Sequence, residues 1–111
     1  PKDDPIRLSN SQLRKIRKSL IFIADGTPVS QIPDEETMIL LPSPTVSLEL
    51  GYALQCKKRE QILLMQMERW EGRYPFDLPN PQQLSFRGET DLKATLPQTL
   101  ETILQRYSLM L

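Results

Sequence analysis

Residues 43–54 read Ser43-Pro-Thr-Val-Ser-Leu-Glu-Leu-Gly-Tyr-Ala-Leu54 and predict a helix with a defined start. A Ser at position 43 can cap the first turn, and Pro44 suits that turn because its missing N–H would have no partner there. The apolar residues recur at helical spacing and predict one buried stripe, formed by Val46, Leu50, Ala53 and Leu54.

Two short apolar runs flank this helix, Leu20 to Ala24 and Gln61 to Met65. Neither run alternates polar and apolar residues, which is typical of central parallel strands that are covered on both faces. A helix between two such strands implies a right-handed crossover. We therefore expect the two strands to be adjacent, parallel and buried on both faces.

The remaining elements extend this pattern in both directions. Ser9 and Gln12 have capping-box spacing and predict a helix start. Glu68 to Pro81 is loop-like, and the weak alternation of Gln83 to Arg87 predicts a strand nearer the sheet edge. Helical spacing from Leu92 to Tyr107 is interrupted at Pro97, which predicts either a kink or a new helix start. The prediction for residues 1–111 is one α/β domain, a parallel sheet with helices on both faces.

The connection from Gly26 to Pro44 is polar and rich in proline. Connections of this length inside a domain are usually functional or mobile. We expect a short extended piece from Thr37 to Leu41, and we expect Gly26 to Pro42 to form a lid that is the most mobile part of the chain without ligand.

Composition excludes several function classes. The 111 residues carry no net charge, so no global field attracts nucleic acid or an anionic membrane, and no apolar run is long enough to span one. The absence of histidine excludes a Ser-His-Asp triad and His-containing zinc sites. One cysteine, Cys56, excludes an intrachain disulfide, fits the cytoplasm, and is expected to be packed on its helix. No secretory leader is visible and no metal is expected.

Without histidine and with one cysteine, any catalysis by this chain must use carboxylates, hydroxyls and backbone amides. In open parallel sheets, ligands bind beyond the carboxyl ends of the strands. Asp25 follows the first strand, and Glu49 lies in the second turn of the next helix, so both carboxylates are expected to face one crevice. The structural alternatives are a boundary glutamate that extends to solvent or pairs with a nearby cation, and an Asp-Gly turn at Asp25.

The helix sequence closely resembles the signature N/S-P-N-V-x-x-E-L-G-Y-A of nucleoside 2-deoxyribosyltransferase-like and TIR-like nucleotide-binding proteins. Other features of that superfamily follow in the same order. They are a strand ending like Ile23-Ala-Asp-Gly-Thr27, a strand like Gln61 to Met65, and a turn like Pro75-Phe-Asp-Leu78. The resemblance covers about residues 12 to 107.

This resemblance implies a flavodoxin-like fold and a nucleotide or nucleoside as small-molecule partner. It implies that Glu49 attacks or stabilises an anomeric carbon, as in deoxyribosyl transfer or cleavage of the nicotinamide–ribose bond of NAD. NAD or another nucleotide would be the substrate, with no required cofactor. The substrate-binding positions are Asp25, Thr27, Ser43, Thr45 and Tyr52, with Tyr52 stacking on a base or serving structure. Gly51 would let the helix pack closely on the sheet, and self-association is expected.

The chain also departs from the family pattern. Thr45 replaces an Asn, and the link from Asp25 to Ser43 is longer than usual. The first strand of the family has no counterpart upstream of Ser9. Three interpretations follow: the chain is the C-terminal part of a larger domain, a second chain completes the site, or the protein is a degenerate relative. The alternative function is a non-catalytic module for nucleotide sensing or assembly.

Overall fold

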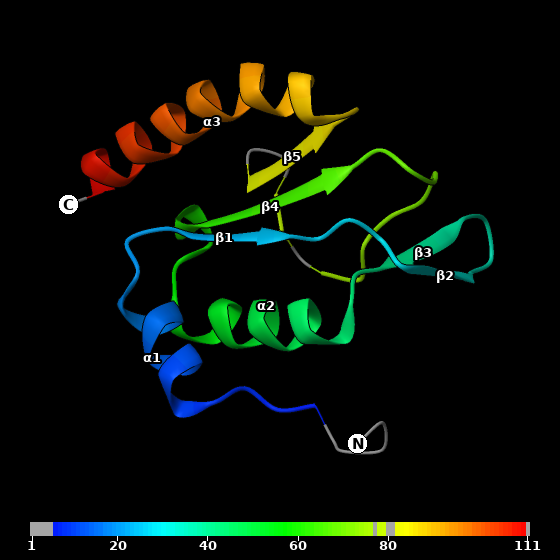
Figure 1. Ribbon diagram of the computed structural model, residues 1–111, viewed down its shortest axis with the longest axis horizontal. Coiled ribbons are helices and arrows are strands. Elements are labelled where there is room, and N and C mark those ends of the chain that lie inside the picture. Colours follow the sequence, from blue (N-terminus) through cyan, green and yellow to red (C-terminus); the bar gives the residue numbers. More distant parts are fainter. Residues whose placement is uncertain (1–5, 77, 80–81, 111) are drawn as a thin grey trace.

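The computed structural model describes residues 6–76, 78–79 and 82–110 (Figure 1). Within them the chain forms, in order, the following elements: α1 (Asn10–Lys18), β1 (Phe22–Asp25), β2 (Ser30–Pro33), β3 (Met38–Leu41), α2 (Pro44–Cys56), the 3-10 turn η1 (Arg59–Gln61), β4 (Ile62–Met67), β5 (Gln83–Phe86) and α3 (Glu89–Met110). The described strands make a three-stranded parallel sheet and a two-stranded antiparallel sheet.

The two predicted helix starts are confirmed. At α1 the Gln12 amide N–H donates to Ser9 Oγ at 3.2 Å, and the Ser9 N–H donates to Gln12 Oε1 at 2.7 Å. This reciprocal capping box satisfies two amide groups that have no partner inside the helix. At α2 the Val46 N–H donates to Ser43 Oγ at 3.3 Å, and Pro44 occupies the first turn.

The three-stranded sheet has the order β1-β4-β5. Its register pairs Phe22 with Ile62 and Asp25 with Met65, and every pair of neighbouring strands is parallel. The predicted adjacency and direction of the first two strands are therefore confirmed. The third strand lies at the sheet edge, as its weak alternation predicted.

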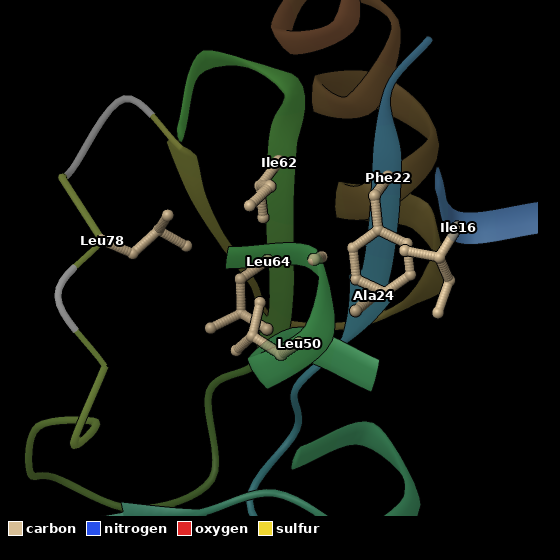
Figure 2. Close-up of a cluster of buried hydrophobic side chains, with 8 residues drawn as sticks. Ile16, Phe22, Ala24, Leu50, Ile62, Leu64 and Leu78 are labelled. Carbon is tan, nitrogen blue, oxygen red and sulfur yellow. The ribbon is translucent and has the colours of Figure 1, made fainter. Parts of the chain in front are cut away.

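One face of this sheet packs against α2. Its core consists of alternate side chains of β1 and β4 packed against α1, α2 and the loop before β5 (Figure 2), namely Phe22, Ala24, Ile62, Leu64, Leu50, Ala53, Ile16 and Leu78. Leu50, Ile62 and Leu64 are completely buried. Each such side chain contributes about 1.5–3 kcal/mol through the burial of apolar surface, so this face supplies much of the stability of the domain.

The other face is only partly covered. Helix α3 packs against β5 and η1, and Leu63, Phe86 and Ile103 are buried on this side. Figure 1 shows α3 on the side of the sheet away from α2, above β5, while β1 lies farther from it. The expectation that β1 is buried on both faces is therefore wrong, because Ile23 remains 40% exposed. For β4 the expectation holds over its first three residues.

The segment expected as a loop from Gly26 to Pro42 contains an antiparallel β-hairpin instead. β2 pairs with β3 from Ser30 opposite Leu41 to Pro33 opposite Met38, and only the extended piece near Thr37–Leu41 was predicted. Two backbone hydrogen bonds join this hairpin to Arg73. The Leu40 N–H donates to the Arg73 carbonyl at 2.7 Å, and the Arg73 N–H donates to the Met38 carbonyl at 3.0 Å. The Arg73 guanidinium also contacts Asp34 at 2.9 Å and lowers the pKa of its carboxyl. The mobility of this segment stays a prediction.

Two further expectations are tested by the described residues. α3 continues through Pro97, so no helix starts there, and the helix is bowed in Figure 1. Cys56 is exposed, so its expected packing is wrong. No helix within the described part of the chain is long and apolar enough to cross a bilayer.

Candidate functional site

Glu49 lies on the second turn of α2 and is half-buried. Its side chain lines a hollow of about 300 Å³ between α1, β1 and α2. The other lining residues are mostly apolar, with three polar side chains from α1 and the turn after it, Gln12, Lys15 and Ser19. A carboxylate, a lysine and a mainly apolar wall thus share one concave surface.

The carboxylate of Glu49 has no hydrogen bond or ion pair among the residues that the structure describes. Lys15 is the cationic residue of the same lining, and no ion pair joins it to Glu49 in the part of the chain that the structure describes. A boundary glutamate with a purely structural role would be expected to pair with such a cation. The cation-paired alternative for Glu49 therefore lacks its contact, and the alternative of a glutamate that extends to solvent stays open.

Asp25 lies at the carboxyl end of β1, as predicted, but its carboxylate is engaged. Its Oδ1 accepts hydrogen bonds from the Thr27 amide at 3.0 Å and the Thr27 hydroxyl at 2.6 Å. The Thr27 hydroxyl oxygen in turn accepts the Met67 amide N–H at 2.9 Å. These contacts form a turn that joins the ends of β1 and β4, which is the structural alternative considered for Asp25.

The structure does not bring Asp25 and Glu49 into one described hollow. Successive side chains of a strand point to opposite faces, and α2 covers the face of Phe22 and Ala24. By this alternation Asp25 shares a strand face with Ile23, and Ile23 is one of the residues that line the hollow of Glu49. Asp25 itself does not line that hollow.

The other predicted binding residues lie in α2 or at its N-cap. Ser43 caps the helix through its hydroxyl, and Thr45 is exposed in the first turn. The Tyr52 hydroxyl accepts a hydrogen bond from Arg17 at 3.3 Å, and its ring packs against the core. Gly51 is exposed and a Cβ there would have nothing within 4 Å, so the close-packing role expected for this glycine is wrong.

Tyr74 is a residue at the strand ends that sequence reasoning missed. Its hydroxyl donates a hydrogen bond to the Gly26 carbonyl. Burial, followed by the nearby charge of Asp25, raises the pKa of Tyr74 to about 12. Tyr74 lies in a loop without periodicity, so no pattern of the sequence pointed to it. The Phe76 ring stacks beside it, 6.3 Å between centroids, while Asp77 of the Pro75–Leu78 motif lies outside the described residues.

A second and larger hollow, of about 480 Å³, opens at the carboxyl ends of β4 and β5. It is lined largely by residues 66–72. The sequence predicted a loop from Glu68 onward but no binding surface in this segment. The available signal was Trp70, the one tryptophan of the chain. None of the six predicted site residues lines this hollow.

No protein-family description, curated protein or solved structure matches this chain. Across the described residues, no three Cys, Asp or Glu side chains gather closely enough to hold a metal ion. The function must therefore be argued from the geometry of the two hollows and from the motif that contains Glu49.

Proposed function

We propose that this domain binds a nucleotide or nucleoside and cleaves its N-glycosidic bond with Glu49. The observation that carries the proposal is a half-buried carboxylate that lines a hollow and has no partner among the described residues. The resemblance of residues 43–54 to the transferase and TIR-like signature supports the same role. The proposal includes a flavodoxin-like fold for the complete domain and a cytoplasmic location.

The chemistry requires a carboxylate beside the anomeric carbon. As the bond between that carbon and the base nitrogen breaks, the sugar becomes an oxocarbenium-like cation, which the Glu49 carboxylate stabilises or traps. Water then releases the sugar and regenerates the carboxylate. In this scheme Lys15, from the same hollow, orients the polar groups of the substrate.

The lining of the hollow favours NAD over an ordinary purine nucleoside. Glu49 is the only acid among its described lining residues, so no second carboxyl group is placed there to protonate a leaving base. Nicotinamide leaves NAD as a neutral molecule from a ring nitrogen that is already positively charged. Its departure therefore needs no general acid, and one carboxylate is sufficient.

The experiment is incubation with NAD, followed by chromatographic measurement of released nicotinamide for wild type and Glu49→Gln. The substitution keeps size and hydrogen bonding but removes the charge, so turnover should disappear while NAD affinity and melting temperature barely change. Glu60→Gln is the matched control, since Glu60 is also half-buried but does not line the hollow. Nicotinamide release that survives Glu49→Gln would exclude the catalytic assignment.

A non-catalytic module for nucleotide sensing or assembly is the second candidate. It is favoured by the hydrogen bonds that already engage Asp25, Thr27, Ser43 and Tyr52 within the fold. This candidate predicts NAD binding without nicotinamide release. It also predicts ligand-dependent self-association, which light scattering during size-exclusion chromatography would detect.

A further inference from the structure

The charges of the chain cancel, so no field of the whole molecule attracts a polyanion. The fold nevertheless separates these charges. Figure 1 shows α1 and the carboxyl end of α2 at one end of the domain, and the turn of the β2–β3 hairpin at the other. That turn contains Asp34, Glu35 and Glu36, whereas lysines and arginines gather at the first end. One end of the domain is therefore basic although the net charge is zero.

Two segments that lie far apart in the sequence, residues 10–20 and 57–61, form this surface, which we call the basic face. The Lys57 ammonium group joins them, because it donates hydrogen bonds to the Arg17 carbonyl at 3.4 Å and to the Ser19 carbonyl. The acceptors are uncharged, so these contacts leave the positive charge of the lysine in place. The fold thus brings two basic runs of the sequence together on one surface.

The basic face carries a large excess of positive charge. It contains seven lysine and arginine residues and one acid, Glu60. The carboxyl ends of α1 and α2 add roughly one negative charge between them through their helix dipoles, which leaves about +5. The salt bridges between described residues all lie elsewhere. Four exposed cations of the face have side chains without a hydrogen bond or ion pair among those residues, namely Arg14, Lys15, Lys18 and Lys58.

The composition of the basic face restricts the kind of partner. Neither segment contains an aromatic residue, so the unstacked bases of a single strand find no ring to stack on. Leu20, 51% exposed, is the one large hydrophobic side chain exposed in segments 10–20 and 57–61. A helix that binds a membrane surface inserts a whole apolar face, and a protein interface has an apolar centre. Phosphate groups, in contrast, need only lysines and arginines.

We propose that the basic face binds the phosphate backbone of a duplex nucleic acid without reading its sequence. The four exposed cations contact phosphates and release the counterions that surround them. The face lies at the amino ends of β1 and β4, opposite the edge at which parallel sheets usually bind small ligands. The proposal therefore goes beyond glycosidic cleavage by Glu49 and does not rest on it. Lys15, which also lines the hollow of Glu49, is left unchanged in the test.

Fluorescence anisotropy of a short labelled DNA duplex, measured over a range of KCl concentrations, tests this proposal. For four phosphate contacts the slope of log K against log[KCl] should be about −3.6, so affinity should fall roughly 100-fold between about 50 and 200 mM. Lys18→Gln/Lys58→Gln should weaken binding and reduce the slope to about −1.8. Arg87→Gln/Lys93→Gln removes the same charge from exposed, ion-paired positions at the other end, and should preserve both affinity and slope.

Further probes separate the possible partners of the basic face. A duplex of unrelated sequence should bind with equal affinity, and a single strand more weakly; an RNA duplex in a parallel titration identifies the preferred backbone. The proposal is overturned if neither duplex binds saturably at low salt, or if the two double variants lose affinity equally. Tighter binding to a polyglutamate peptide or to phosphatidylserine vesicles would also overturn it, as would salt-sensitive self-association that Lys18→Gln/Lys58→Gln abolishes. No measurement involves NAD or alters Glu49, so failure here leaves the glycosidase proposal untouched.

Discussion

Substituting Ala at Gly72 and at Gly51 should change stability in opposite directions. Gly72 has a φ of +150°, which L side chains rarely adopt, and a Cβ there would lie 2.5 Å from the backbone oxygen of Met38. The side chain of Leu40 would be 3.0 Å away. Because Met38 also accepts the Arg73 amide, the backbone cannot move aside without losing a hydrogen bond. Strain of about 1–3 kcal/mol and overpacking of about 1–3 kcal/mol together predict a loss of roughly 2–6 kcal/mol.

Gly51 is the matched position for the same substitution. It is an exposed residue within α2, and a Cβ there would have nothing within 4 Å. Gly51→Ala should therefore stabilise the domain by about 0.5–1 kcal/mol, the usual effect in a helix interior. Urea unfolding followed by circular dichroism measures both variants. The geometric argument fails if Gly72→Ala is as stable as wild type, or if Gly51→Ala is the more damaging of the two.

Three other measurements test the fold. Leu64→Ala should cost about 3–5 kcal/mol and Ile23→Ala only about 1–2 kcal/mol in urea unfolding, since Leu64 is completely buried whereas Ile23 is 40% exposed; equal costs would contradict the uncovered face of β1. In an absorbance titration, Tyr74 should lose its proton only at about pH 12, and Tyr74→Phe should remove that late step. Because the folded state favours its protonated form, this contribution to stability should be complete below about pH 10 and lost between about pH 10 and 12. The amides of Ser30, Gln31 and Ile32, all exposed residues, should exchange with solvent faster than those of β4; equal protection would exclude a mobile lid.

The parts of the fold that were predictable depend on short-range chemistry. Ser9 and Gln12 predict the start of α1 because the two residues hydrogen-bond to each other's backbone across one turn. Ser43 and Pro44 predict the start of α2 because the serine caps the helix and the proline suits its first turn. The apolar runs predicted parallel strands because a helix separates them. Local signals of this kind remain readable without knowledge of the tertiary structure.

The missed parts depend on contacts between distant segments. β2 is exposed at all four residues, so no burial pattern distinguishes it from a loop. Backbone hydrogen bonds join its partner β3 to Arg73, which lies more than thirty residues later in the chain. The coverage of β1 was misjudged for a related reason, since its apolar sequence does not show that α3 packs over β5 instead.

The candidate site also has one part that local sequence signals predicted and one part that depends on contacts between distant segments. The motif around Glu49 predicted a carboxylate on the second turn of α2, and the structure places it in a hollow. Asp25 does not line that hollow, and its carboxylate accepts hydrogen bonds from Thr27. No short-range pattern of the sequence shows either fact. The Trp70 hollow was not predicted because its residues follow β4 in a loop without periodicity.

The contacts of Asp25 and Thr27 connect the end of β1 with this second hollow. The Thr27 hydroxyl donates a hydrogen bond to Asp25 and accepts one from the amide of Met67, which itself lines the hollow. One residue after Thr27, the Pro28 carbonyl accepts the hydrogen bond from Arg69 that fixes the guanidinium over the indole of Trp70. The segment after β1 thus forms hydrogen bonds at two successive positions, one to the last residue of β4 and one to the loop that follows it. The turn that Asp25 and Thr27 form is thus joined by hydrogen bonds to the chain segment that carries Trp70.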